Sequence, residues 1–289
     1  MSCHCAFLSE DQFPQIAQTF DEAFADYYLK STRKAEEWLY NRMVKNAVEF
    51  DYSVGAFDGD RMVGITLIGI DDWQGQMAAF DAGTGIVPDY RGQGLARQMF
   101  DFAVPKLRER GVTKFLLEVL QVNEPAIKAY ERTGFSVTRE FDCLGLERKT
   151  FTPGKSCELE IEIKALPQGQ VKNFHNFADW QPSWENSFAT IARIPDDVLI
   201  NGAFLGDECI GLIAYYPLLN WIMTLVVKPE HRRRGVAASL LSNFIENFNG
   251  EVPQINLVNV DRSDAGMLWF LKKMGFKLFT SQYEMELEL

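Results

Sequence analysis

The chain contains the same loop twice, and this repetition constrains its fold more than any other feature. The first copy is Ile86-Val87-Pro88-Asp89-Tyr90-Arg91-Gly92-Gln93-Gly94-Leu95-Ala96, and the second is Val227-Lys228-Pro229-Glu230-His231-Arg232-Arg233-Arg234-Gly235-Val236-Ala237. Pro88 and Pro229 lie 141 residues apart, and the Gly-Phe pairs that begin at Gly134 and Gly275 have the same spacing. Two separate landmarks with one spacing indicate the tandem duplication of a whole domain. We therefore predict two domains, at residues 1–150 and 157–289.

Hydrophobic patterning predicts the same order of elements in both halves. Each half reads as a strand, two helical segments, a hairpin, a strand, the repeated loop with its helix, another strand, another helix and a closing region. The predicted segments of the first half are 3–8, 13–28, 34–46, 52–57, 62–70, 77–87, 94–110, 114–119, 124–133 and 135–147. Those of the second half are 159–165, 171–178, 184–191, 199–205, 209–216, 221–227, 235–247, 255–260, 266–273 and 283–289.

Composition limits the possible functions. Hydrophobic residues make up 47% of the 289 positions and charged residues 24%, so both halves can build a packed core. The formal net charge of −11 argues against nucleic acid as a partner and mildly favours cationic ligands such as amines. The five cysteines are scattered, which is typical of reduced thiols in a cytoplasmic protein, and no metal site is predicted.

Two segments bear on membrane association. The amino-terminal residues include no basic stretch before Glu10 and Asp11, so no signal peptide is recognised. The run from Cys209 to Val227 is apolar enough to suggest a membrane span, but Pro217 and Asn220 interrupt it. We interpret this run as two buried strands joined by a turn, and we expect no membrane partner.

The repeated loop has the features of an anion-binding site. A strand leads into a glycine-rich turn that opens a helix, where backbone N–H groups are free and the helix end is partially positive. A nucleoside-triphosphate loop is excluded because its Gly-Lys pair is absent. A dinucleotide fingerprint is excluded because Arg97 occupies the position of its third glycine.

The pattern Val-x-Pro-x-x-Arg-x-x-Gly-x-Ala after a strand resembles the GCN5-related N-acetyltransferase (GNAT) family. The segment Asn123-Glu-Pro-Ala126-Ile-Lys-Ala-Tyr130-Glu-Arg-Thr-Gly134-Phe135 is similar to a later motif of the same family. The resemblance implies an α/β (α+β) protein of two tandem GNAT-like domains, each with a central mixed, mostly antiparallel sheet flanked by helices. It also implies acetyl-CoA as a co-substrate.

By this resemblance, the first loop holds the pyrophosphate of acetyl-CoA through backbone N–H groups from Arg91 to about Ala96, and Arg91 and Arg97 add positive charge. Ile86 and Val87 pair with the pantetheine amides, and Asn123 reaches the pantetheine arm. The predicted cofactor-binding residues of the first half are Ile86, Val87, Arg91, Gly92, Gln93, Gly94, Leu95, Ala96, Arg97, Asn123 and Ala126.

Tyr130 is the predicted general acid, which protonates the departing CoA thiolate; this role is implied by the resemblance. Without the motif, Tyr130 reads as a core aromatic residue. Asp81 and Glu118 are the candidate bases, because each is a carboxylate inside an otherwise apolar strand, where an unpaired charge is costly. Water is a further candidate for the base.

The second half departs from the family pattern. Leu271, Asp264 and Met267 stand at the positions of Tyr130, Asn123 and Ala126. The cofactor-binding residues predicted to persist there are Val227, Arg232, Gly235 and Ala237. The second half is therefore interpreted as a degenerate domain that binds CoA weakly or serves as a structural partner. Its basic triplet, Arg232–Arg234, is either a loop that holds phosphates or a solvated turn.

The sequence as a whole predicts an acetyl-CoA-dependent enzyme that acetylates a primary amine of a small molecule or peptide by direct attack. A non-catalytic acyl-CoA-binding or sensor protein is one alternative, and a transferase of a longer acyl chain is another. Neither the acceptor nor the oligomeric state is predicted, because acceptor recognition depends on variable helices and loops.

Overall fold

The computed structural model describes residues 3–26, 35–154, 157–248, 250 and 252–289, and it divides into two compact units. The first unit holds Met1–Thr138 together with Tyr283–Leu289, and the second holds Arg139–Gln282. Each unit therefore contains a strand end contributed by the other half of the sequence. The ranges 1–150 and 157–289 follow the sequence repeat and stay a prediction, whereas the compact units exchange their closing strands.

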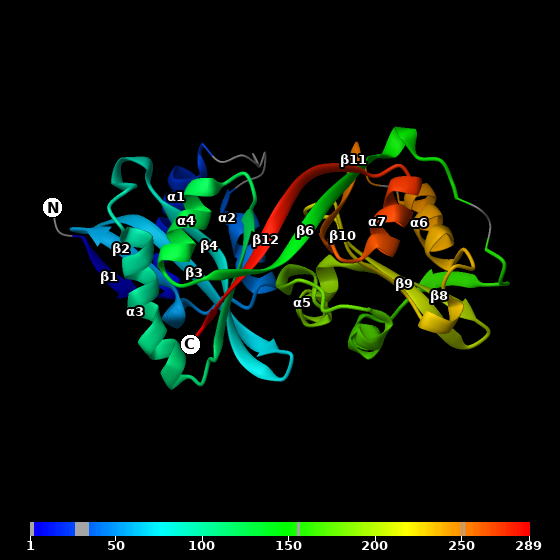
Figure 1. Cartoon of the computed structure of the whole chain (residues 1–289), viewed down its shortest axis with the longest axis horizontal. Coiled ribbons are helices and arrows are strands. Elements are labelled where there is room, and N and C mark those ends of the chain that lie inside the picture. The colour runs from blue at the N-terminus through cyan, green and yellow to red at the C-terminus, as the bar shows by residue number, and fades with distance from the viewer. Residues whose placement is uncertain (1–2, 27–34, 155–156, 249, 251) are drawn as a thin grey trace. The chain divides into compact units, whose positions relative to one another are not determined.

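The first unit builds its sheet in the order β1-β2-β3-β4-β5-β12 (Figure 1). Neighbouring strands from β1 to β4 are antiparallel, whereas β4 and β5 are parallel, which gives a mixed and mostly antiparallel sheet. Its elements are β1 (His4–Phe7), α1 (Phe13–Phe24), α2 (Ala35–Lys45), β2 (Val54–Asp58), β3 (Arg61–Trp73), β4 (Gln76–Ile86), α3 (Leu95–Glu109), β5 (Lys114–Leu120), α4 (Glu124–Arg132), the start of β6 (Ser136–Glu147) and the end of β12 (Lys277–Glu288).

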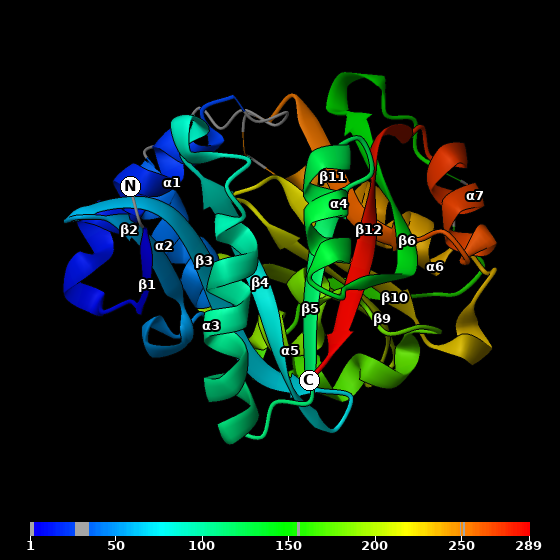
Figure 2. The same cartoon turned by 60° about the vertical axis from the view of Figure 1, so that its left-hand side comes forward.

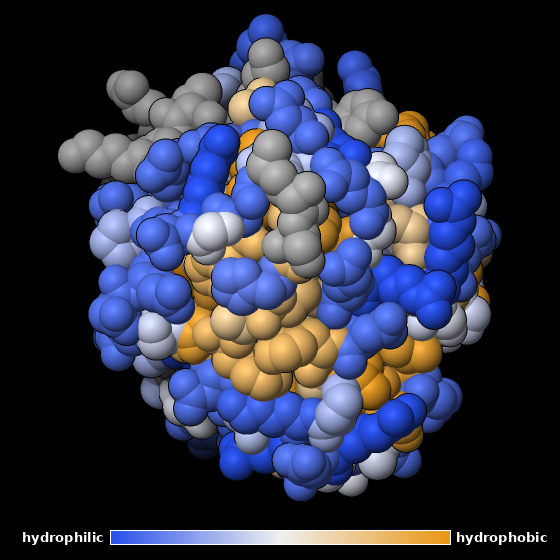
Figure 3. Space-filling view, turned by 90° about the vertical axis from the view of Figure 1, so that its left-hand side faces the viewer, coloured by the Kyte–Doolittle hydropathy of each residue, from blue (hydrophilic) through white to orange (hydrophobic). Residues whose placement is uncertain are grey.

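Helix α3 packs on one face of this sheet, and Figure 2 shows it in front of the strands. Leu95, Met99, Ala103 and Leu107 recur at helical spacing, and all four are buried in the core of the unit. Met285, near the end of β12, joins the same core. The end of β12, from Tyr283 onward, is thus an integral part of the first unit. Figure 3 shows an otherwise polar face on which apolar residues gather near the centre.

The second unit repeats this architecture in the order β6-β11-β10-β9-β8-β7. Again one strand pair, β10–β11, is parallel, whereas the pairs β6–β11, β9–β10, β8–β9 and β7–β8 are antiparallel. The elements are β7 (Glu162–Ala165), the 3-10 helices η5 (Gln168–Phe177) and η6 (Trp184–Asn186), α5 (Phe188–Arg193), β8 (Leu199–Leu205), β9 (Glu208–Tyr216), β10 (Trp221–Val227), α6 (Val236–Asn247), β11 (Gln254–Asp261), α7 (Ala265–Lys273) and parts of β6 and β12.

The predicted elements differ from the structure mainly at the start of the second half. The segment 171–178 is 3-10 rather than α-helical, and 184–191 begins as a 3-10 turn before α5. The strand predicted from Leu159 begins only at Glu162, because Leu159 and Ile161 pack on the core without pairing. In the first half, α1 ends at Phe24, and the end of the predicted helix lies outside the described residues.

The apolar run from Cys209 to Val227 forms two antiparallel strands, β9 and β10, as the sequence predicts. Within the described residues, no helix has the length and hydrophobicity needed to cross a membrane.

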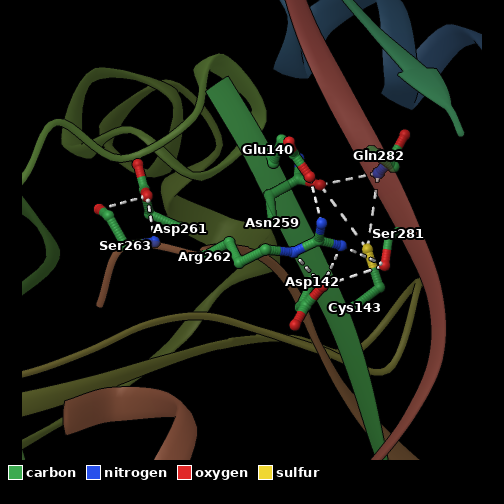
Figure 4. A network of polar contacts seen from close by, with 9 residues as sticks. All are labelled: Glu140, Asp142, Cys143, Asn259, Asp261, Arg262, Ser263, Ser281 and Gln282. Carbon is green, nitrogen blue, oxygen red and sulfur yellow. Dashed lines mark hydrogen bonds and ion pairs between the residues drawn. The ribbon is translucent and has the colours of Figure 1, made fainter. Parts of the chain in front are cut away.

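Arg262 contacts both exchanged strands, β6 and β12, inside the second unit (Figure 4). Its guanidinium pairs with Glu140 and with Asp142 of β6, the latter at 2.9 Å, and donates to Ser281 Oγ of β12 at 3.1 Å. Gln282 Nε2 donates to Asn259 Oδ1 of β11 at 2.7 Å. These contacts lie close to the residues at which β6 and β12 leave the second unit.

Candidate active site

The strands β4 and β5 part in the middle of the first unit. They pair in parallel from Ala78 to Asp81, opposite Lys114 to Leu117, and the parallel pairing ends there. On the other side of β4, the register with β3 shifts between Asp81 and Gly83, which leaves Ala82 as a bulge. The remaining residues of β4, up to Ile86, stay paired with β3. The backbone groups of these residues that face away from β3 can therefore pair with an extended ligand.

The loop after β4 is shaped by two glycines. Gly92 and Gly94 have φ angles of 75° and 76°, a left-handed conformation that strains other residues. A Cβ atom at either position would meet nothing within 4 Å, so the loop surface is open. Helix α3 begins at Leu95, and the N–H groups of its first turn lack intrahelical acceptors. The turn and the helix end together form a site suited to a phosphate group.

The two arginines of this loop differ in role. Arg91 donates to the carbonyls of Ile86 (3.1 Å) and Ala23 (2.9 Å) and pairs with Asp26 at 2.6 Å. The hydrogen bond between Arg91 and Asp26 raises the pKa of Arg91 and lowers that of the Asp26 carboxyl. Arg91 therefore ties the loop to α1. Arg97 lies exposed on the first turn of α3, paired with Asp101 at 3.4 Å, where its charge can reach a bound anion.

The remaining predicted cofactor residues lie in the loop after β4, at the start of α3 and at the start of α4. Val87 is buried and donates its N–H to Val63 O, and Gln93 Nε2 donates to Asp89 O at 3.4 Å. Asn123 caps α4, since its side chain accepts from the N–H of Ala126 at 3.4 Å. The other members of the predicted set lie in the same loop and core region: Ile86 and Ala126 pack against the core, Leu95 is buried within it, and Ala96 follows on α3.

Asp81 occupies the point where β4 and β5 part. Its Oδ1 accepts from the N–H of Gly83 at 2.9 Å, and its Oδ2 accepts from Thr84 Oγ1 at 2.8 Å and from the Tyr130 hydroxyl at 3.2 Å. The residue is only 6% exposed. Burial raises the pKa of Asp81 from its ordinary 3.8 to about 6, although the hydrogen bonds from Thr84, Gly83 and Tyr130 oppose this rise. Asp81 therefore titrates near neutral pH.

Tyr130 reaches Asp81 from α4. Its ring packs edge-to-face against Phe100 and Phe135, with centroid distances of 6.0 and 5.8 Å. The ring thus packs against the core, while its hydroxyl donates a hydrogen bond to the Asp81 carboxylate. Glu118, the other candidate base, lies on β5 one residue beyond Leu117, which is the register partner of Asp81. The structure brings Asp81 and Tyr130 into direct contact and places Glu118 on the adjacent strand.

The second unit has the same backbone features. Strands β10 and β11 pair only at Trp221–Ile222, and a register shift leaves Met223 as a bulge. Gly235 has a φ of 90° before the first residue of α6. Arg232 donates to Val227 O at 2.9 Å and pairs with Asp179 at 2.6 Å, as Arg91 does with its own partners. Ala237 follows in the first turn of α6.

Three polar side chains of the first unit are replaced by apolar ones at the matching positions of the second. Ile222, Leu225 and Leu271 stand 141 residues after Asp81, Thr84 and Tyr130, and all three are buried in the apolar core. Asp264 keeps the capping role of Asn123, since it accepts from the N–H of Met267 at 2.8 Å. The fold is duplicated, whereas the polar side chains of Asp81, Thr84 and Tyr130 are not repeated at the matching positions.

Comparison with known proteins agrees with this architecture. A model described as "Acetyltransferase (GNAT) family" matches residues 13–135 and again 163–276. A mycothiol acetyltransferase of Corynebacterium aurimucosum is 43% identical over 56 residues, which are 19% of this chain and 18% of that protein. The N-alpha-acetyltransferase 30 of Schizosaccharomyces pombe is 29% identical over 128 residues, which are 44% of this chain and 79% of that protein.

The solved structures include a tandem GNAT protein from the clavulanic acid biosynthesis pathway. It has a TM-score of 0.73 at 14% identity, over 99% of this chain and 98% of that one, a likeness of fold. The family match covers both units, and the structural likeness extends over the tandem arrangement. The chain belongs to the acetyltransferase (GNAT) family, as a member with two tandem domains.

Proposed function

We propose that the first unit transfers the acetyl group of acetyl-CoA to a primary amine of a small molecule or peptide. The observation that carries this proposal is the contact between the Tyr130 hydroxyl and Asp81 Oδ2, at the point where β4 and β5 part. It joins a proton donor and a proton acceptor beside an open strand edge and an anion-binding loop. Such a pair serves acyl transfer, because the amine must lose a proton and the thiolate must gain one.

The cofactor would lie along this opening. The N–H groups of the Gly92–Ala96 segment and the end of α3 would hold the pyrophosphate, with Arg97 adding charge. The edge of β4 beyond Asp81, where the pairing with β5 ends, and the adjacent Val87 would offer backbone groups to the pantetheine amides, and the start of α4 at Asn123 and Ala126 would border the arm. Arg91 would act indirectly, by holding the loop against α1.

Asp81 is the base that the geometry favours over Glu118 or water. At pH 7.5 most of the Asp81 carboxyl is ionised, since its pKa is about 6. It takes one proton from the substrate ammonium, and the free amine attacks the thioester carbonyl as the C–N bond forms. The C–S bond then breaks, the Tyr130 hydroxyl protonates the thiolate, and the amide nitrogen releases its remaining proton to solvent. Protonated Asp81 restores the Tyr130 hydroxyl across their hydrogen bond.

The second unit would serve as a cofactor-binding or structural partner without chemistry. Its loop keeps Val227, Arg232, Gly235 and Ala237, but Leu271 and Ile222 can neither give nor take a proton. The acidic net charge of the chain favours a cationic acceptor, and amines are cationic at neutral pH. The S. pombe relative is also named for N-acetylation.

The test is a screen of primary amines, including peptides with free amino termini, with acetyl-CoA and detection of the free thiol. Turnover with at least one amine, lost in Tyr130→Phe, supports the proposal. Binding of acetyl-CoA without turnover across the panel would favour an acyl-CoA sensor instead. Faster reaction with longer thioesters would favour transfer of a longer acyl chain.

A further inference from the structure

Thr84 shares an oxygen of Asp81 with Tyr130. The Thr84 hydroxyl lies 2.8 Å from Asp81 Oδ2, closer than the Tyr130 hydroxyl at 3.2 Å. Behind Thr84, the hydroxyl of buried Thr66 lies 3.1 Å away, and the two threonines are register partners on β3 and β4. The Thr84 hydroxyl therefore has a second hydrogen-bond partner besides Asp81.

The bulge in β4 explains how Asp81 and Thr84 meet. Residues three apart in a regular strand point to opposite faces, because side chains alternate. The extra residue, Ala82, removes this alternation and brings the two side chains together. The flanking Gly83 and Gly85 face α1, where a Cβ atom would lie 3.2 Å from Phe20 and 2.7 Å from Phe24. The Thr84 side chain, between these two glycines, lies on the opposite face of the strand.

We propose that Thr84 is a positioning residue, which holds the Asp81 carboxylate in line with the Tyr130 hydroxyl and stabilises its ionised form. The proposal rests on the function proposed above for the first unit. The Gly83 N–H fixes Oδ1, and the Thr84 hydroxyl fixes Oδ2. With both oxygens held, the carboxyl cannot rotate away from the Tyr130 hydroxyl or from an entering amine.

The surroundings of Asp81 predict the direction of the effect. Burial is the largest influence and raises the pKa of Asp81, while the bond from Thr84 is the largest of those that lower it. Tyr130 on α4 and the positive charge of Arg42 on α2 act in the same direction as Thr84, and the Glu118 carboxyl stands on neighbouring β5. Loss of the Thr84 hydroxyl should therefore raise the pKa of Asp81 further.

The second unit provides an internal comparison. It keeps the bulge, at Met223, but has Ile222 and Leu225 in place of Asp81 and Thr84. The bulge therefore does not itself require a threonine at this position. Position 84 carries a hydroxyl beside Asp81, whereas the matching Leu225 carries none beside Ile222, as expected if the role of the hydroxyl is to hold that carboxylate.

The test compares Thr84→Val, which keeps the shape, with Thr84→Ser, which keeps the hydroxyl. A hydrogen bond to a charged group is worth about one pKa unit or more, so the Asp81 titration should rise by about one pH unit in the valine variant. The acid limb of kcat/KM should move with it, which lowers activity about fivefold at pH 6 and less than about twofold above pH 8.5. The serine variant should restore both.

A second readout does not depend on turnover. Carboxyl 13C NMR, with the Asp81 signal assigned by its loss in Asp81→Asn, follows the titration directly. Thr19→Val is the matched control, because it removes a buried hydroxyl of α1 that bonds to the carbonyl of Gln15. An equal loss of activity at every pH, with an unmoved Asp81 titration, would overturn the proposal. A shifted titration in a protein that acetylates no amine would leave the positioning role intact and refute the proposed function instead.

Discussion

The Tyr130 hydroxyl lies 3.2 Å from Asp81 Oδ2, although 49 residues separate them in the sequence. Two features create this contact. The bulge at Ala82 directly follows Asp81 at the point where β4 and β5 part, and the Asn123 cap sets the start of the helix that carries Tyr130. Neither feature has a direct part in proton transfer, yet both fix where the proton donor and acceptor lie.

Replacement of Tyr130 by Phe tests the acid. The ring contacts with Phe100 and Phe135 are kept, so only the proton donor is lost. We expect kcat to fall by about a hundredfold or more, the usual scale for a lost general acid, with little change in CoA affinity. Steady-state kinetics and calorimetric titration measure the two effects. Tyr52→Phe, at a ring that packs beside Lys106, is the control. A variant within twofold of the wild type would mean that Tyr130 is only a core residue.

The sequence predicts the fold and the loop well, because repeated periodicity and glycine position are local signals. The repeat identifies both glycine-containing loops and the strand–helix units around them. The exchange of closing strands was not predictable, since β6 and β12 have the same pattern whichever sheet they complete. The bulge at Ala82 is also invisible in the sequence, so Thr84 reads as an ordinary strand residue. Arg91 reads as a phosphate ligand, and its partner Asp26 is recognised only in the folded chain.

The choice between the two candidate bases is tested by Asp81→Asn and Glu118→Gln. If Asp81 is the base, its loss should lower kcat/KM by about two orders of magnitude and remove the acid limb near pH 6. The Glu118 variant should keep that limb. The pH dependence of kcat/KM from pH 5 to 9 decides between them. An acid limb that persists in Asp81→Asn and disappears in Glu118→Gln would reverse the assignment.

Asp81 should also lower the stability of the first unit at neutral pH. Its folded-state pKa lies above the ordinary 3.8, so between pH 4 and 6 the folded state binds more protons than the unfolded state. The free energy of unfolding should therefore fall as pH rises through this window, by up to about 3 kcal/mol from this group. Asp81→Asn should remove this contribution and melt higher than the wild type at pH 7.5. Thermal unfolding at pH 4.5 and 7.5 checks this, and a variant that melts lower at pH 7.5 would contradict it.

The last prediction concerns the division of labour between the two loops. Gly94→Glu places a side chain and a negative charge where the pyrophosphate of acetyl-CoA would lie, so acetylation should be abolished. Gly235→Glu makes the same change in the second unit, whose Leu271 and Ile222 can transfer no proton, so most activity should remain.

Both glycines have left-handed backbones, and any side chain there adds strain of about 1 kcal/mol. Gly94→Ala and Gly235→Ala therefore separate strain from charge, and circular dichroism confirms folding. Acetylation rates and acetyl-CoA titrations of the four variants decide the matter. If folded Gly235→Glu is inactive while Gly94→Glu retains activity, the second unit is the catalytic one.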